Sequence, residues 1–451
     1  MFIQPFKSDG LSHLSYLIGN NGEAVVIDPR RDCECYAQAA AAEGCRITTI
    51  LETHRNEDLI SGAPVLSELT GARVYHGPNA AGEVRYAETV REDDEFKFGN
   101  LKLKVLETPG HTDDSLSFAL YDTEFGKEAV AVFTGDTLFI GDVGRTDFYP
   151  DRAKEVAGLL YDSLHKLLAL GDQALIFPAH GAGSVCGNNM ADREFSSIGY
   201  ERRNNPMIQI HSRAEFVEQK VREHHYQPPY FRDMERLNLQ GGDATKRVLT
   251  PAALSPAAFK KLPHHTVTLD VRGISSFLGA HLPGSLALPI QMIPAFAGWF
   301  LQPDDELALV ASNEQEAELA ARHLARIGFD KVLGFLAPDM PHWAAGAEPF
   351  DAVTVIDVNE FESRRNNPPS DWQVLDVRGK DEVEENPIEG AVHHYVGQLA
   401  EESSELTASN HYTVMCGSGA RAAIAASVLM RQGFKKVDVF LGSFGALMSD
   451  S

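Results

Sequence analysis

An internal repeat is the feature that most restricts how the second half of this chain folds. The pentapeptide LDVRG occupies residues 269–273 and occurs again 106 residues later, at residues 375–379. Gly284 and Gly390 keep the same spacing. Repetition at a fixed spacing indicates two copies of one structural unit. Each copy alternates short apolar runs with helical stretches, which predicts a small parallel sheet with crossover helices.

The first half of the chain has a different pattern. Short apolar runs such as residues 24–27 and 101–106 end in polar or glycine-rich turns, which is typical of buried strands with chemistry at their ends. Residues 152–170 place leucines and valines at helical spacing, which predicts a packing helix. Loop-like composition near residues 240–243 and 346–349 predicts two breaks. The expected domains are residues 1–245, 250–346 and 352–451.

The charge and cysteine content exclude several classes of protein. The 451 residues include 40 Lys and Arg and 64 Asp and Glu, which gives a net charge of -24. This balance argues against a nucleic-acid-binding protein, because binding of phosphate groups requires clustered basic residues. No run approaches the roughly 18 apolar residues of a membrane span, and the first residues lack the layout of a secretion signal. Five cysteines are too few for a disulfide framework. We expect a cytoplasmic protein without a nucleic-acid or membrane partner.

A glycine-rich loop in the last domain begins with Cys416. It runs Cys-Gly-Ser-Gly-Ala-Arg, between an apolar run that ends near Val414 and a helical run from Ala422. A strand, a tight loop and a helix in this order direct backbone N–H groups and the helix dipole at one centre. A cysteine there is expected to be a reactive thiolate, and Arg421 can hold an anion beside it; the alternative is a buried structural cysteine. The remaining candidate substrate-binding residues of this loop are Gly417, Ser418, Gly419 and Ala420.

The spacing from Cys416 to Arg421 resembles the active loop of the rhodanese family, and the LDVRG repeats resemble rhodanese domains. The earlier copy has Ala311 and Glu316 at the corresponding positions, 105 residues before. A methyl group cannot act as a nucleophile, and a carboxylate would repel a thiolate or persulfide. We therefore interpret residues 250–346 as a degenerate copy that cannot perform sulfur transfer.

Four strand-end motifs in the first domain resemble the metallo-β-lactamase family in order and spacing. This resemblance implies an αββα sandwich with a metal at one edge. The fold class that we predict is α/β: a metallo-β-lactamase sandwich followed by two small rhodanese-like parallel-sheet domains. The four motifs are Thr53–Asp58, Thr108–Thr112, Thr134–Thr137 and Pro178–Gly181.

The first motif departs from the family pattern H-x-H-x-D-H. Asn56 replaces the second histidine and Leu59 the third. Leucine cannot bind a metal, and a neutral amide is a poor substitute for imidazole at a zinc site. The complete remaining set is His54, His111 and Asp136. Two histidines and one carboxylate with open positions opposite form the facial triad of non-haem Fe(II) oxygen chemistry.

Among metallo-β-lactamase-like proteins, that subset and the segment Gly144–Phe148 are similar to the persulfide dioxygenases. The resemblance implies one Fe(II) per chain, which would oxidise a small-molecule thiol persulfide with O2 to sulfite and thiol. Cys416 would then transfer sulfane sulfur between sulfite and thiosulfate, in either direction. We also expect a homo-oligomer.

Four further residues receive provisional roles near this centre. Asp58 and His180 are expected to orient the metal ligands, although each could have another role. Arg145 either binds substrate or pairs with a neighbouring aspartate. Cys186 either holds substrate sulfur or is an inert loop cysteine. Because the substrates are anions and the chain is acidic, we expect a positive group at each site, Arg421 at one and Arg145 at the other.

Two other functions agree with parts of this pattern. One is a zinc-dependent thioester hydrolase of the glyoxalase II type, which would use the same metal motifs without O2. The other is a sulfur-carrier protein that acts only through Cys416, with no metal chemistry. The remaining cysteines are interpreted as structural; they are Cys33, Cys35 and Cys45.

Overall fold

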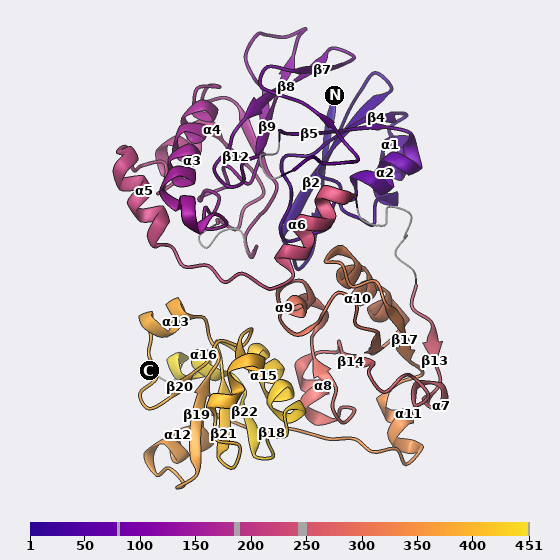
Figure 1. Cartoon of the computed structure of the whole chain (residues 1–451), viewed down its shortest axis with the longest axis vertical. Coiled ribbons are helices and arrows are strands. Elements are labelled where there is room, and N and C mark those ends of the chain that lie inside the picture. Colours follow the sequence, from indigo (N-terminus) through magenta and orange to yellow (C-terminus); the bar gives the residue numbers. More distant parts are fainter. Residues whose placement is uncertain (79–81, 185–189, 242–249, 450–451) are drawn as a thin grey trace. The chain divides into compact units, whose positions relative to one another are not determined.

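The computed structural model describes residues 1–78, 82–184, 190–241 and 250–449 (Figure 1). The chain forms two compact units. Unit 1 is Met1–Val248 with Ala325–Gly328, and unit 2 is Leu249–Leu324 with Phe329–Ser451. Among the helices of the described residues, none is long and apolar enough to cross a membrane. The three-domain division stays a prediction, and most of its first break falls within residues 242–249, outside the described residues.

Two six-stranded sheets form the centre of unit 1. The first has the order β1-β2-β3-β4-β5-β6 and the second the order β12-β11-β10-β9-β8-β7. The strands of the first sheet are β1 (Phe2–Ser8), β2 (His13–Asn20), β3 (Glu23–Ile27), β4 (Arg46–Leu51), β5 (Arg73–His76) and β6 (Glu88–Thr89). Those of the second are β7 (Glu95–Phe98), β8 (Leu101–Glu107), β9 (Leu116–Asp122), β10 (Ala131–Gly135), β11 (Leu175–Pro178) and β12 (Ser196–Ser197).

Alternation along β3 explains why two layers of core flank the first sheet. Val25 and Ile27 pack with Phe118 and Phe133 of the second sheet, in the core between the sheets. Ala24 and Val26, which point the other way, pack against helices α1 (Glu34–Ala42) and α2 (Ala63–Thr70) instead. A strand that is buried on both faces must be apolar at every position, as the sequence of this run is.

Helices cover the outer face of each sheet (Figure 1). The predicted packing helix is confirmed as α3, and its leucines pack on β9, β10 and β11. The αββα sandwich is therefore confirmed. The helices of unit 1 are α1 (Glu34–Ala42), α2 (Ala63–Thr70), η1 (Pro150–Arg152), α3 (Ala153–Leu168), α4 (Ile198–Asn204), α5 (Arg213–Arg222) and α6 (Phe231–Gln240).

Unit 2 contains two five-stranded parallel sheets with the same strand order, as the repeat predicts. The orders are β13-β17-β16-β14-β15 and β18-β22-β21-β19-β20. The strands of the first sheet are β13 (Ala253–Leu254), β14 (Val267–Asp270), β15 (Leu286–Ala287), β16 (Leu307–Val310) and β17 (Val332–Leu336). Those of the second are β18 (Thr354–Ile356), β19 (Trp372–Asp376), β20 (Val392–His393), β21 (His411–Met415) and β22 (Val437–Phe440).

Helices join the parallel strands of both sheets. The first copy has α7 (Pro256–Phe259), α8 (Ile274–Gly279), η2 (Ile290–Met292), α9 (Ile293–Phe300), α10 (Glu314–Arg326) and α11 (Met340–Ala345). The second has α12 (Val358–Asn366), α13 (Lys380–Glu385), α14 (Leu399–Glu402), η3 (Ser403–Glu405), α15 (Ala420–Arg431) and α16 (Ser443–Ser449).

The repeated LDVRG sequence has the same structural role in both copies. In the first copy the Asp270 carboxylate accepts hydrogen bonds from the Arg272 guanidinium and backbone N–H. In the second, Asp376 and Arg378 form the same pair, at 2.7 Å. These aspartates are buried at a strand end, where a charge needs a partner. The motif therefore repeats because it fixes the turn after the strand.

Candidate functional site

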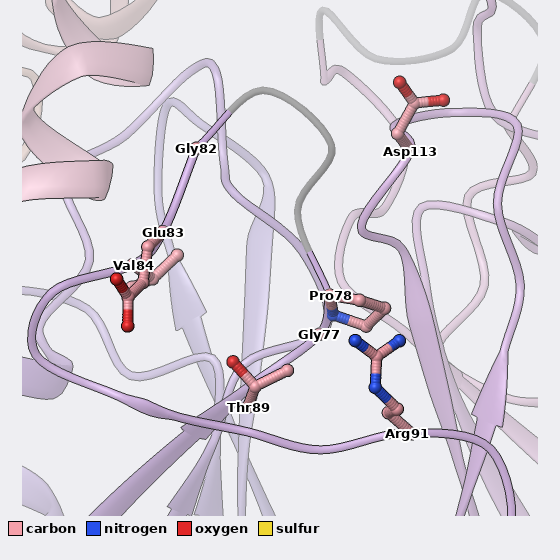
Figure 2. A pocket seen from close by; sticks show the side chains of 8 residues that line it. All are labelled: Gly77, Pro78, Gly82, Glu83, Val84, Thr89, Arg91 and Asp113. Carbon is pink, nitrogen blue, oxygen red and sulfur yellow. The ribbon is translucent and has the colours of Figure 1, made fainter.

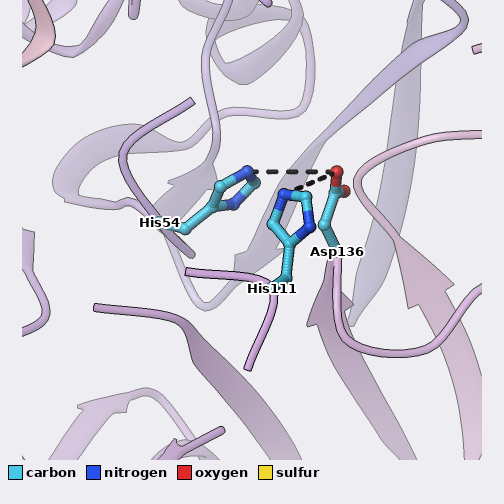
Figure 3. A group of neighbouring side chains, drawn as sticks. All are labelled: His54, His111 and Asp136. Carbon is cyan, nitrogen blue, oxygen red and sulfur yellow. Dashed lines mark ion pairs between the residues drawn. The ribbon is translucent and has the colours of Figure 1, made fainter. Parts of the chain in front are cut away.

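Three predicted ligands meet at one edge of the unit 1 sandwich (Figure 3). His54 follows β4, His111 follows β8 and Asp136 follows β10. All three side chains are buried, and one donor atom from each lies within 4.8 Å of the others. The Asp136 Oδ2 atom is 3.5 Å from His111 Nε2 and 4.0 Å from His54 Nε2. Residues 25 to 82 positions apart in the sequence are thus brought together because their strands end at the same edge.

Thr53 and Asp28 fix the orientation of the His54 ring. The Thr53 hydroxyl lies 2.8 Å from Asp28 Oδ2 and 2.9 Å from His54 Nδ1, and the Thr53 N–H donates to Asp28 Oδ1. Burial raises the pKa of Asp28 to about 7, although the hydrogen bonds from Thr53 oppose this rise. Where Asp28 is ionised, the hydroxyl donates to it and accepts from His54 Nδ1–H. His54 Nε2, which has no hydrogen bond within the described residues, then presents its lone pair to the centre.

The His111 ring indicates that the centre attracts a cation. Its Nδ1 lies 3.0 Å from the Arg145 carbonyl oxygen, which can only accept, so Nδ1 carries a proton. Its Nε2 faces the carboxylates of Glu57 at 3.0 Å and Asp136 at 3.5 Å. Burial opposes protonation, but these carboxylates raise the pKa of His111 to about 9. This part of the site therefore favours a positive charge next to the two carboxylates. A metal ion held by the Nε2 lone pair, in place of that proton, fits the donor set.

Glu57 is a member of the site that the sequence analysis missed. Its buried carboxylate lies 3.0 Å from His111 Nε2 and 3.8 Å from His54 Nε2. Burial disfavours its charge, yet His111 and His54 hold its pKa well below the usual range, so it stays ionised. It was passed over because the family pattern has no ligand at this position. An acidic residue within three positions of a ligand histidine was the available signal.

Asp58 and His180 form a chain of contacts that ends at Asp136. His180 Nδ1 is 2.8 Å from Asp136 Oδ1, and His180 Nε2 is 2.9 Å from Asp58 Oδ2. The imidazole therefore bridges two buried carboxylates and fixes the rotamer of Asp136. This arrangement fits residues that orient a ligand, which is one of the roles considered for each, and that role stays a prediction. The Asn56 side chain donates to the His54 carbonyl oxygen, at 3.4 Å.

Arg145 forms a bidentate pair with Asp147, one of its two predicted alternatives. Arg145 Nε and Nη2 each lie 2.6 Å from an oxygen of Asp147, and the guanidinium lies 4.8 Å from the centroid of the Phe148 ring. The carbonyl oxygen of Arg145 also accepts the hydrogen bond from His111 Nδ1. The pair with Asp147 therefore helps to hold the segment that fixes the His111 ring. A role in substrate binding stays a prediction.

Replacing Asp147 by asparagine is expected to lower the free energy of unfolding at pH 7 by about 2 kcal/mol. Burial alone would raise the pKa of Asp147, but Arg145 lowers it to about 2. A carboxylate whose pKa is lowered in the folded protein stabilises the fold at pH values above its pKa in the unfolded chain. This stabilisation is lost as the pH falls through the folded-state pKa. The difference between wild type and Asp147→Asn should therefore shrink from pH 4 toward pH 2. Urea denaturation across this range measures it.

The matched control is Asp162→Asn, which removes a carboxylate from an exposed pair with Arg213 in the same unit. An exposed pair contributes little, so the change in unfolding free energy should stay below about 1 kcal/mol. Equal losses in both variants would contradict a stabilising role of the pair that Asp147 forms with the buried Arg145.

The glycine-rich loop of the last copy connects β21 to α15. The Cys416 N–H donates to Ser443 Oγ, and the Gly419 N–H donates to Cys416 Sγ, each at 3.1 Å. Gly419 has φ 105, a conformation that favours glycine, and starts the helix. Cys416 is buried. Ser418 lies in the bend that leads to Gly419, and Ala420 is the first residue of α15; a role of these residues in sulfur binding stays a prediction.

The guanidinium of Arg421 is already paired with a carboxylate. Its Nη1 and Nη2 atoms lie 2.5 Å and 2.7 Å from the two carboxylate oxygens of Glu382, on α13. Glu382 is the second residue that the sequence analysis missed, because it lies far from the loop in sequence.

The degenerate copy shows what replaces the loop chemistry. Ala311 is buried after β16, at the position of Cys416. Glu316, at the position of Arg421, accepts a hydrogen bond from the Ser312 N–H, at 2.9 Å. A carboxylate thus occupies this backbone N–H group. This geometry agrees with the interpretation that this copy performs no sulfur transfer.

The other cysteines of the described residues are Cys33, Cys35 and Cys45. Cys33, Cys35, Cys45 and Cys416 are free thiols. Burial raises the pKa of the Cys33 thiol to about 12, which makes it a poor nucleophile. Cys186 lies outside the described residues, so its predicted role stays untested.

One cavity of about 500 Å³ opens beside the loop that carries His111 (Figure 2). Arg91 is the cation of its wall, and Glu83 and Asp113 are the carboxylates. The carbonyl oxygen of Asp114 lies against Gly77, where a Cβ atom would be 2.3 Å from it. This cavity is therefore next to the metal-binding loop.

Comparisons with known proteins agree with this description. Residues 8–180 match the metallo-beta-lactamase superfamily, and residues 357–450 match the rhodanese-like domain. The crystal structure of a metallo-beta-lactamase from Staphylococcus aureus subsp. aureus COL is 30% identical, with a TM-score of 0.67; the match covers 74% of this chain and 98% of that one.

Two groups of curated relatives match the first half of the chain. The mitochondrial persulfide dioxygenase ETHE1 of Bos taurus is 32% identical over 212 residues, which are 45% of this chain and 74% of the relative. A hydroxyacylglutathione hydrolase of Methylobacterium nodulans is 38% identical over 144 residues, or 32% of this chain and 52% of the relative. The chain thus spans about half the length of the hydrolase.

Proposed function

Because this chain belongs to the metallo-β-lactamase superfamily and joins such a domain to a C-terminal rhodanese-like domain, we propose that it is a persulfide dioxygenase with an attached sulfurtransferase. The substrate is a small-molecule thiol persulfide. The balanced reaction is R–S–SH + O2 + H2O → R–SH + H2SO3, in which the outer sulfur is oxidised and O2 is reduced.

The observation that carries this proposal is the donor set. His54, His111 and Asp136 form a buried group for one metal, while Asn56 and Leu59 remove two histidines that the two-metal hydrolases use. Two histidines and one carboxylate suit Fe(II) with open positions for a sulfur ligand and O2. We propose one Fe(II) per chain.

The residues of the chain hold the reactants in place. A bound Fe(II) would supply the electron-transfer chemistry that lets O2 react with a persulfide sulfur. His54, His111 and Asp136 hold their donor atoms on one face, and Thr53 and the Arg145 carbonyl fix the two rings. Burial excludes bulk water from these atoms. Because these donors are fixed, the persulfide sulfur and O2 would be held close together, which lowers the entropic cost of the reaction.

The second reaction takes place at Cys416. Its thiolate attacks the sulfane sulfur of thiosulfate, the bond to the sulfonate group breaks, and sulfite leaves with the electron pair. The product is a Cys416 persulfide, and the reverse reaction gives thiosulfate from sulfite. The Gly419 N–H, which faces Sγ, stabilises negative charge on the sulfur.

Metal analysis followed by O2 consumption tests this function. Protein purified without O2 should contain about one iron per chain, and a panel of small-thiol persulfides should cause O2 uptake matched by sulfite formation. Stoichiometric zinc with no O2 uptake would instead establish the hydrolase. The similarity to the hydroxyacylglutathione hydrolase favours that second candidate, and thioester cleavage by the zinc protein would confirm it.

The cellular location and the oligomeric state of the protein are also part of this proposal. The four described cysteines are free, which suits a reducing cytoplasm, whereas the ETHE1 relatives are mitochondrial. We retain the cytoplasm and a homo-oligomer as predictions, with sulfite or thiosulfate as the partners at Cys416.

A further inference from the structure

We propose that Glu382 determines which sulfur donors Cys416 accepts, by occupying the Arg421 guanidinium so that monoanionic donors are favoured over dianionic thiosulfate. This inference rests on the proposed sulfurtransferase function of the last domain.

Direct contacts place the Glu382–Arg421 pair at the sulfur-binding loop. The guanidinium binds both carboxylate oxygens, at 2.5 Å and 2.7 Å, which is the bidentate geometry of a strong pair. A Cβ atom at Gly417 would lie 3.2 Å from Arg421 Nη2 and 4.0 Å from Glu382 Oε1. The pair therefore lies against the backbone of the residue that follows Cys416.

Glu382 is held in this position from its own helix as well. Its Oε2 atom accepts a hydrogen bond from the Gly379 N–H at the start of α13, at 2.9 Å. Partial burial opposes its ionisation, but Arg421 keeps the pKa of Glu382 below the ordinary value. The carboxylate is thus charged and doubly anchored, so an incoming anion must compete with it for Arg421.

The neighbouring cation is also paired. Arg378, which precedes α13, forms its pair with Asp376 at 2.7 Å and stacks over the Phe444 ring at 4.6 Å. Both arginines that the described contacts place beside this loop are therefore compensated by a carboxylate.

The degenerate copy supplies independent support within the same chain. The repeat places Ser276 at the position of Glu382 and Glu316 at the position of Arg421. The copy without the thiol thus lacks both members of the pair, whereas it keeps the structural pair of Asp270 and Arg272. This pattern ties the Glu382–Arg421 pair to the sulfur chemistry rather than to the fold.

The charge argument makes a distinction between two donors with the same sulfane sulfur. Thiosulfate carries two negative charges, and methanethiosulfonate carries one. The Cys416 thiolate attacks the outer sulfur of either; the S–S bond breaks, and sulfite or methanesulfinate leaves with the electron pair. A carboxylate beside the loop repels the second charge of thiosulfate, while the backbone N–H groups can hold a single charge.

Glu382→Gln in the full chain is the test. Glutamine keeps an oxygen for the Gly379 N–H but releases the charge of Arg421. We expect kcat/KM for thiosulfate to rise on the order of tenfold, mostly through KM, with a change below about threefold for methanethiosulfonate. Cyanide serves as the sulfur acceptor, and thiocyanate is measured. Glu382→Asp retains the charge and should keep the wild-type preference between the donors.

Asp381→Asn is the matched control, because it removes the same charge from an exposed position in the first turn of the same helix. It should leave the ratio of the two donors unchanged. An unchanged ratio in Glu382→Gln, or equal losses with both donors, would overturn the inference and leave the pair a structural support. If Glu382→Gln fails to fold, a changed ratio in Glu382→Asp overturns the inference and a preserved ratio supports it. If wild type transfers no sulfur from either donor, the proposed sulfurtransferase function fails, and this inference with it.

Discussion

Replacing His111 by alanine is expected to abolish metal binding and persulfide oxidation together. The substitution removes one of three buried donors and leaves the Glu57 carboxylate without its nearest histidine. Bound metal should fall from about one per chain to near zero, and sulfite formation from persulfide should fall on the order of a thousandfold or more. Metal analysis after dialysis and an O2 electrode measure the two quantities.

His165→Ala is the matched control for this prediction. His165 lies on the exposed face of α3 in the same unit, where its ring contacts the Tyr161 carbonyl oxygen. Metal content and O2 uptake should stay at the wild-type level in this variant. The His111→Ala protein should also retain sulfur transfer at Cys416, which shows that it is folded. Full O2 uptake by His111→Ala would mean that the centre is not the oxidation site.

Replacing Cys416 by serine is expected to have the converse effect. Serine keeps the shape of the loop but offers no thiolate to accept sulfane sulfur. Thiocyanate formation from thiosulfate should therefore fall on the order of a thousandfold or more, while O2 uptake with persulfide stays near the wild-type level. Parallel assays of thiocyanate and O2 on one preparation measure both activities.

Two further variants make the Cys416 prediction specific. Cys45→Ser removes a thiol from the first unit and should change neither activity. Ala311→Cys combined with Cys416→Ser should stay inactive, because Glu316 occupies the Ser312 N–H in that copy. Sulfur transfer by the double variant would show that the earlier copy lacks only its thiol. Loss of O2 uptake in Cys416→Ser would show that the two sites depend on one another.

Most of the fold could be predicted from local sequence patterns. The LDVRG repeat predicted two related parallel sheets, and both have the same strand order. The run of residues 24–27 predicted a buried strand, and β3 is one, with both of its faces buried. These predictions succeeded because burial imposes a periodicity that is visible within a few residues. The placement of each turn at a strand end follows from the same patterns.

The candidate site could be predicted only where a residue carries its own chemical signature. His54, His111 and Asp136 were found from their motifs, and the structure brings them together. Glu57 was missed because its contact with His111 depends on how two strand-end loops face each other. Arg145 was left with two alternatives, and the geometry pairs it with Asp147.

The sequence by itself determined which chemical groups this protein has and roughly where each strand ends. It showed a thiol in a glycine-rich loop, its loss at Ala311, and a ligand set that lacks two histidines of the family pattern. Only the tertiary structure decided which charges are compensated. Glu382 and Arg421 meet because α13 and α15 both start at the same edge of a parallel sheet. Electrostatic effects depend on distances across the fold, and local sequence does not specify those distances.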